Sequence, residues 1–452
     1  SYGTSGSDNI SSNLWRETWS SLGSGSNHTP INGELGSFYR PDGLLANSKL
    51  KWETTISRNF GIDFGFLNNR VNGSLEVYWN TTKDLLMAVP VDNTTGYSYQ
   101  FQNFGKTSNR GIELSVNVDV INKGDFRFNV GAIYNYNRNK LDELPNADQY
   151  LYSSYWGSSS LVPTNDYMFV EGKAIGLVRG FISEGYYTVD DFNYTNGQYV
   201  LKEGVPDITK ALTATYMHPY DLPAGQTAFP GAAKFRDVDE SGTVDLDDAT
   251  CLGEVMPRHT GSFQLNFNYK NFDLSTNFNW TAGGKVYNVA AMINASGQEF
   301  DGIGAQRASW VADAFKVYNV NAAGDLYAVT NPDELRALNA NAKYHLPYHQ
   351  SGITSSEWLE NGSYLRLQTL TLGYTLPKNW LTKVHVDKIR LYLTATNLFT
   401  ITGYSGIDPE VNANPTGQSG FYSDLRIFPT LNMDFGTYPR ARTFTFGANI
   451  TF

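Results

Sequence analysis

Apolar and polar residues alternate through residues 443–452, the last strand that the sequence predicts. One face carries Phe444, Phe446, Ala448, Ile450 and Phe452, and the other carries Thr443, Thr445, Gly447, Asn449 and Thr451. The pattern is typical of a transmembrane β-strand, which presents apolar side chains to lipid and small polar ones to an aqueous lumen. The last strand of a soluble β-sandwich, whose apolar face belongs to the core, has the same pattern. Both architectures stay open on this strand alone.

Eight further segments alternate in the same way, so we predict nine spanning strands in all. The eight are residues 60–66, 75–79, 112–120, 126–136, 263–269, 272–280, 365–376 and 389–396, of which 365–376 is the least regular. In a barrel, the side chains expected to face lipid include Val116, Phe128, Phe267, Phe278, Phe444, Phe446 and Ile450. Those expected to face the lumen include Glu113, Asn266 and Asn449.

The lengths of the connections favour a barrel over a sandwich. Short connections fall near residues 68–70, 122–124, 270–271 and 377–385, and long ones near 88–107, 140–260, 284–362 and 399–439. Short and long connections alternate strictly, as short periplasmic turns and long extracellular loops do in outer-membrane barrels. If the last strand ends on the periplasmic side, all the long loops are extracellular. The odd strand count then places residues 1–50 outside as well.

The predicted fold class is all-β, and the chain is expected to be the C-terminal portion of a larger antiparallel transmembrane barrel. Single-chain bacterial barrels have even strand counts, and loops of this length suit a barrel of about 22 strands with a plugged lumen. The missing strands and plug would precede residue 1. A net charge of −10 disfavours nucleic acid as a partner, and the single cysteine, Cys251, excludes an internal disulfide. No nucleophile elbow or phosphate loop is present, so we do not expect an enzyme.

Residues 237–248 have the spacing of a calcium-binding loop. Oxygen donors fall at loop positions one, three, five, seven, nine and twelve, namely Asp237, Asp239, Ser241, the Thr243 carbonyl, Asp245 and Asp248. Gly242 lies at position six, where such loops turn sharply, and Val244 is the apolar anchor. Position twelve is Asp rather than the longer Glu, as in dockerin-type loops. The alternative is a solvated acidic turn without an ion.

Two further features of the long loops lead to weaker predictions. Asn331-Pro332-Asp333-Glu334 predicts a capped helix that runs to about Asn339. A group of aromatic residues could stack on sugar rings, although packing between loops is the commoner use of such side chains. The group comprises Tyr150, Tyr152, Tyr155, Trp156, Tyr186 and Tyr187.

Several stretches in a fixed order resemble the SusC/RagA family of TonB-linked outer-membrane transporters of the Bacteroidetes. Early stretches are residues 50–55, 59–65, 82–86, 235–239 and 269–274. Later ones are Trp358 to Leu367, Leu372 to Pro377, Asn397 to Glu410 and the terminal strand. Together they span nearly the whole chain.

The resemblance implies a 22-stranded barrel with an N-terminal plug and a TonB box, both outside this chain. It also implies a SusD-like lipoprotein lid and import of oligosaccharides or peptides driven by TonB–ExbB–ExbD. No substrate-binding residue is carried over from the family. Two alternatives remain: a siderophore-type TonB receptor without a lid, and a secreted calcium-stabilised glycan-binding protein.

Overall fold

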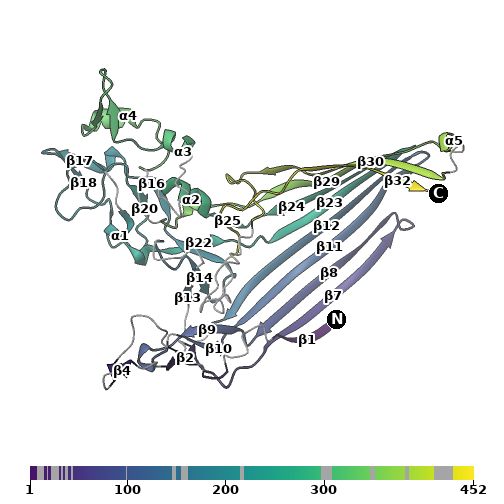
Figure 1. Cartoon of the computed structure of the whole chain (residues 1–452), viewed down its shortest axis with the longest axis horizontal. Coiled ribbons are helices and arrows are strands. Elements are labelled where there is room, and N and C mark those ends of the chain that lie inside the picture. Colours follow the sequence, from purple (N-terminus) through teal and green to yellow (C-terminus); the bar gives the residue numbers. More distant parts are fainter. Residues whose placement is uncertain are drawn as a thin grey trace.

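The computed structural model shows a large curved sheet with a lobe of long loops at one end (Figure 1). It describes residues 1–7, 15–17, 19–21, 30–31, 34–35, 39–41, 44–97, 99–144, 149–153, 161–213, 218–296, 308–346, 352–381, 386–411 and 431–452. The sheet contains ten antiparallel strands, and each pairs with its neighbours in chain order. They are β1 (Tyr2–Ser7), β7 (Glu53–Phe66), β8 (Val71–Lys83), β11 (Lys106–Lys123), β12 (Phe126–Glu143), β23 (His259–Tyr269), β24 (Phe272–Ala282), β29 (Tyr364–Thr375), β30 (Lys388–Thr402) and β32 (Thr443–Thr451).

The prediction of nine strands was wrong by one, because β1 adds a tenth. Tyr2–Ser7 pairs with β7 from Tyr2 opposite Arg58 to Ser7 opposite Glu53, so the start of residues 1–50 belongs to the sheet rather than to an extracellular loop. The strand contains glycine, serine and threonine in place of alternating apolar residues, so hydrophobic periodicity does not reveal it. Among the described residues, β1 and β32 each pair with one neighbour, and the sheet is an open segment of a barrel wall.

The register confirms the two predicted faces of the sheet. One row of facing residues crosses four strands: Val116 on β11, Ala132 on β12, Phe263 on β23 and Phe278 on β24. All seven side chains expected to face lipid lie on this one face, and Glu113, Asn266 and Asn449 lie on the other. We call the first the outward face and the second the lumen face. Ring pairs between neighbouring strands, such as Phe128 and Phe267 with centroids 4.3 Å apart, reinforce the outward face.

The alternation of short and long connections is also confirmed. The β7–β8 turn uses positive φ at Leu67, Asn68 and Asn69, and the β23–β24 turn uses Lys270 at φ 53°. Gly124 at φ 57° turns β11 into β12, and α5 (Lys378–Leu381) lies in the fourth short connection. The long connections leave the opposite end of the sheet, after β8, β12, β24 and β30.

The long loops and the segment before β7 contain small sheets and short helices. Their strands are β2 (Trp19–Ser21), β3 (Pro30–Ile31), β4 (Glu34–Leu35), β5 (Tyr39–Pro41), β6 (Leu44–Leu45), β9 (Leu86–Pro90), β10 (Tyr99–Asn103), β13 (Gln149–Tyr152), β14 (Tyr167–Val170), β15 (Leu177–Gly180), β16 (Ser183–Tyr186), β17 (Phe192–Thr195), β18 (Gln198–Leu201), β19 (Asp207–Ile208), β20 (Ala233–Phe235), β21 (Thr243–Val244), β22 (Thr250–Glu254), β25 (Lys285–Asn288), β26 (Tyr318–Val320), β27 (Leu326–Ala328), β28 (Leu359–Asn361) and β31 (Met433–Asp434). Their helices are α1 (Lys210–Thr213), α2 (Val289–Ser296), α3 (Ala308–Asp313) and α4 (Pro332–Leu338), with 3₁₀ turns η1 (Asn93–Thr95), η2 (Val189–Asp191), η3 (Leu246–Asp248) and η4 (Ser356–Trp358).

The predicted helix start at residue 331 is confirmed by α4. The Asn331 side chain accepts hydrogen bonds from the backbone N–H groups of Asp333 and Glu334, as an N-cap does. No helix in the described ranges is both long enough and apolar enough to cross a membrane.

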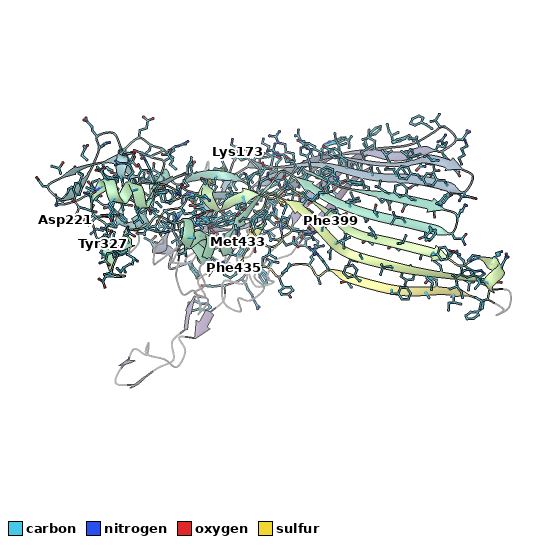
Figure 2. The ribbon with its side chains drawn as sticks, turned by 90° about the horizontal axis from the view of Figure 1, so that it is seen from above. Lys173, Asp221, Tyr327, Phe399, Met433 and Phe435 are labelled. Carbon is cyan, nitrogen blue, oxygen red and sulfur yellow. The ribbon has the colours of Figure 1, made fainter. Side chains whose placement is uncertain are left out.

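The loop lobe is built around two hydrophobic cores that the loops share. The near core draws residues from all four long loops, among them Met87, Tyr167, Tyr287 and Met433. The far core joins the β12–β23 and β24–β29 loops through residues such as Phe229. Figure 2 shows Met433 between Phe399, at the end of the sheet, and Asp221 and Tyr327, at the far end of the lobe. Both cores are therefore shared between loops that are distant in sequence.

Candidate functional sites in the long loops

The acidic loop 237–248 folds around its own carboxylates. Asp237 accepts hydrogen bonds from the backbone N–H groups of Ser241, at 3.1 Å, and Gly242, at 2.7 Å. Asp239 accepts a hydrogen bond from the Ser241 N–H at 3.0 Å. Hydrogen bonds from Ser241 hold the pKa of Asp239 below its ordinary value. Glu240 and Gly242 have φ of 59° and 87°, which produces the tight reversal that the spacing predicted.

Asp248 closes the loop from the buried side. Its side chain is fully buried, and its oxygens accept hydrogen bonds from the N–H groups of Val238, at 2.5 Å, and Asp245, at 2.8 Å. Val244, the predicted anchor, is fully buried in the far core, and Thr243–Val244 pairs with Asp207–Ile208 as a two-stranded parallel ladder. The loop is thus attached to the rest of the lobe on both sides.

The structure brings together three of the predicted ligands. Asp237, Asp239 and Asp248 have carboxylate oxygens within 4.8 Å of one another. The side chain of Asp245 instead caps η3 by accepting a hydrogen bond from the Asp247 N–H. The Ser241 hydroxyl donates to the Thr243 carbonyl oxygen at 3.0 Å, which keeps these two predicted donors adjacent.

The loop aromatics mostly pack inside the lobe rather than lie open to a ligand. Tyr152 and Tyr187 are buried in the near and far cores, and Tyr150 and Tyr186 pack against those cores. Tyr155 and Trp156 lie outside the described residues. The packing interpretation therefore holds for the four aromatic residues that the structure describes.

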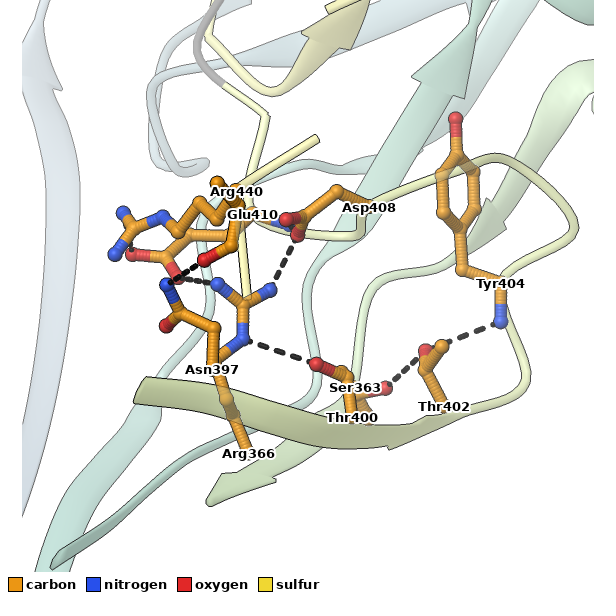
Figure 3. A network of polar contacts seen from close by, with 10 residues as sticks. Ser363, Arg366, Asn397, Thr400, Thr402, Tyr404, Asp408, Glu410 and Arg440 are labelled. Atoms are coloured by element: carbon orange, nitrogen blue, oxygen red, sulfur yellow. Dashed lines mark hydrogen bonds and ion pairs between the residues drawn. The ribbon is translucent and has the colours of Figure 1, made fainter. Parts of the chain in front are cut away.

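A polar network joins the β30–β32 loop to the sheet (Figure 3). Arg366, on the lumen face of β29, is almost fully buried and binds Asp408 at 2.5 Å and Glu410 at 3.0 Å. Its Nε also donates to the Thr400 hydroxyl at 3.0 Å. Arg440 binds the other oxygen of Glu410 at 2.5 Å, so both ends of the loop meet at this carboxylate.

Sequence reasoning did not find this network. Arg366, Asp408 and Glu410 lie in two of the stretches that carry the family resemblance, 358–367 and 397–410, and Arg440 lies beyond both. The two stretches are 30 residues apart, and neither sequence indicates that its side chains bind the other. A second contact fixes the same loop, because Glu360 accepts hydrogen bonds from the N–H and hydroxyl of Ser405, both at 2.7 Å. We call the Arg366–Asp408–Glu410 group the loop anchor.

An antiparallel sheet with a continuous apolar outward face, a polar lumen face and long loops at one end is the wall of an outer-membrane β-barrel. The chain belongs to the family described as TonB dependent receptor-like, beta-barrel, which it matches over residues 6–398. It lies in the bacterial outer membrane, and its curated relatives are named TonB-dependent receptors rather than enzymes. The soluble sandwich and the secreted glycan-binding protein are thereby excluded.

Relatives confirm the resemblance to SusC and RagA. The TonB-dependent receptor P3 of Formosa agariphila is 29% identical over 100% of this chain and 39% of that protein. The TonB-dependent receptor SusC of Bacteroides thetaiotaomicron is 27% identical over 90% of this chain and 32% of that protein. A solved structure of the RagAB peptide transporter has the same fold, with a TM-score of 0.65 and 21% identity over 100% of this chain and 40% of the matched one. The chain thus spans about two fifths or less of the length of these proteins.

Proposed function

We propose that the protein containing this chain imports oligosaccharides or peptides across the outer membrane, driven by the TonB–ExbB–ExbD system. The observation that carries this proposal is the family match together with the alignment to SusC over 90% of the chain. The plug and TonB box would lie in the N-terminal part of the whole receptor. In this chain, the polar lumen face provides the wall of the import path.

We further propose that a SusD-like lipoprotein covers the extracellular mouth. The β12–β23, β24–β29 and β30–β32 loops form a lobe with two cores of its own, which is far more structure than closing a barrel mouth requires. A lobe with a packed core loses little conformational entropy when a partner docks on it. The competing proposal is a siderophore-type receptor that works without a lid.

Uptake and co-purification test these two proposals separately. Deleting the gene in its native bacterium should abolish uptake of a labelled oligosaccharide or peptide, and restoring the gene without the TonB box should not rescue uptake. Unchanged uptake of every tested ligand of both classes would refute import of this kind. A lipoprotein of SusD type should co-purify in mild detergent, and a receptor that is always purified alone would favour the siderophore type.

Loop 237–248 is proposed to bind one calcium ion through Asp237, Asp239, Ser241, the Thr243 carbonyl and Asp248, with Asp245 direct or through water. Three carboxylates converge within 4.8 Å, and in the described part of the chain none of them forms an ion pair with lysine or arginine. Their mutual repulsion favours a cation, and calcium takes six to eight hard oxygen ligands. The ion would tie Asp248, at the far core, to the exposed tip of the loop.

A further inference from the structure

Basic side chains gather on the outward face of four adjacent strands, at the end nearest the loop lobe. They are Arg58 of β7, Lys83 of β8, Lys106 and Arg110 of β11, and Arg138 and Lys140 of β12. The register places them on the outward face. Arg110 is two residues from Ile112 on β11, and it lies opposite Trp79 of β8 and Arg138 of β12, which is two residues from Tyr136. We call this group the basic rim.

The basic rim begins where the apolar band ends. On β12 the outward residues from Phe126 to Tyr136 are all apolar or aromatic, and Arg138 is the next outward residue. Phe126 and Tyr136 are ten residues apart. At a rise of about 3.3 Å per residue, on a strand tilted by about 40° from the membrane normal, this stretch forms a band about 25 Å tall. This is the height of the apolar band of transmembrane barrels, so Arg110 and Arg138 lie at the level of the outer-leaflet headgroups.

The rim places like charges directly opposite each other. Arg110 lies opposite Arg138, and Lys83 lies opposite Lys106. Directly opposed like charges destabilise a sheet unless an anion lies between them. Among the described residues, Lys106 and Lys140 are the members of the rim that have acidic partners, Glu143 at 2.9 Å and Asp142 at 3.5 Å. Within the described ranges, Lys83, Arg110 and Arg138 form no ion pair.

The remaining strands show that this charge is not a general feature of the barrel wall. The outward positions of β23, β24, β29, β30 and β32 carry no lysine, arginine, aspartate or glutamate; the one titratable imidazole there is His259. β23 and β24 end at the register level of Tyr136, since His259 lies opposite Tyr136 and Ala282 lies opposite His259. Within the sheet, the basic rim is therefore formed by β7, β8, β11 and β12.

A shallow pocket of about 520 Å³ opens beside the patch. Outward residues that line it include Val77, Trp79, Ile112 and Tyr136. Arg110 also lines it, on the side nearest the loop lobe. An apolar pocket directly below exposed arginines matches an amphiphile, with an acyl chain in the pocket and an anionic group at the guanidinium groups.

We propose that the basic rim binds the phosphate of a phosphorylated outer-leaflet lipid, held between Arg110 and Arg138 with an acyl chain against Trp79. Arginine suits this position because its guanidinium forms paired, charge-assisted hydrogen bonds to phosphate oxygens. The bound anion would offset the repulsion between the opposed charges and fix the orientation of this side of the barrel in the membrane.

Lipid binding to the full receptor in detergent micelles tests the proposal. Native mass spectrometry would count bound lipid A that carries phosphate and, in a parallel titration, lipid A from which the phosphate has been removed. The phosphorylated lipid should bind and the dephosphorylated lipid should not. The R138Q variant should weaken binding about fivefold, and R110Q/R138Q about thirtyfold. The matched control is R127Q, which removes an exposed arginine from the lumen face at the opposite end of β12.

Four outcomes would overturn the proposal. Equal binding of the two lipids would show that phosphate is not recognised. Unchanged binding in R110Q/R138Q, with R138Q also unchanged, would show that the rim is not the site. Full displacement of the lipid by inorganic phosphate at equal concentration would show a free-anion site. A receptor dimer that R138Q converts to monomers, without change in lipid binding, would assign the face to a second copy of the chain. Heat-modifiable electrophoretic mobility checks that each variant is folded.

Discussion

Replacing Arg366 by methionine should release the β30–β32 loop from the barrel wall. Methionine keeps much of the apolar stem and removes the charge. The Arg366 side chain is 2% exposed and that of Asp408 is 9% exposed, so R366M leaves a buried carboxylate without its cation. Removing one partner of a buried ion pair costs about 3–5 kcal/mol. The loss of the Arg366–Glu410 contact adds little to this cost, because the Glu410 side chain is 36% exposed and keeps Arg440 as a partner.

Hydrogen exchange in the full receptor measures this cost locally. The N–H of Ser405 donates to Glu360 at 2.7 Å, and that of Glu410 donates to Asp408 at 2.9 Å, so both amides report on the anchored state. A loss of about 3–5 kcal/mol should speed their exchange by about two to three and a half powers of ten. Peptides that cover 403–411 should change most.

The Arg390–Asp273 pair provides a matched control for the loop anchor. It is also an arginine–aspartate pair at 2.5 Å on the lumen face, but it lies toward the short-turn end and is more exposed. R390M should leave exchange in 403–411 unchanged. The double variant R366M/D408L should recover part of the protection at Ser405, because no charge is then left buried; the Glu410 N–H loses its acceptor in this variant and does not report on recovery. Unchanged exchange in R366M, or an equal change in R390M, would refute the anchor.

Three further predictions concern the metal loop, the membrane faces and pH. Calcium at 100 times its dissociation constant should stabilise the lobe by about 2.7 kcal/mol in thermal unfolding. D239N should abolish most of this calcium-dependent stabilisation. D247N, which removes an exposed carboxylate that is not a predicted ligand, should leave the stabilisation unchanged. Val116→Arg, on the outward face at mid-band, should cost about 2–4 kcal/mol in the unfolding free energy, and Asn117→Arg, on the lumen face, far less; equal costs would contradict the assigned faces. Burial lowers the pKa of His218, which stacks on Phe229 at 4.0 Å, below its ordinary 6.5. The unfolded chain then takes up a proton that the folded lobe does not, so the lobe should lose stability as the pH falls below about 6.5. H218Q should flatten this pH dependence, measured by hydrogen exchange. An equal pH dependence in H218Q would show that His218 does not cause it.

The sequence by itself determined the features that depend on neighbours along the chain. Alternation with a period of two predicts both the strands and their faces, because each strand residue points opposite to the next. Spacing within twelve residues predicted that Asp237, Asp239 and Asp248 would converge, and Asn331 marked the start of α4. The order of short and long connections predicted, before any pairing was known, that the long loops leave the same end of the sheet.

Tertiary structure alone decided what depends on pairing between distant segments. β1 has no periodic signal and is a strand because β7 offers it hydrogen-bonding partners. The loop anchor joins Arg366 to Asp408, and the basic rim joins residues from 58 to 140, through the register of four strands. No local pattern encodes such contacts, because they arise when strands far apart in sequence align side by side. The two shared loop cores have the same origin, since each is assembled from residues of more than one loop.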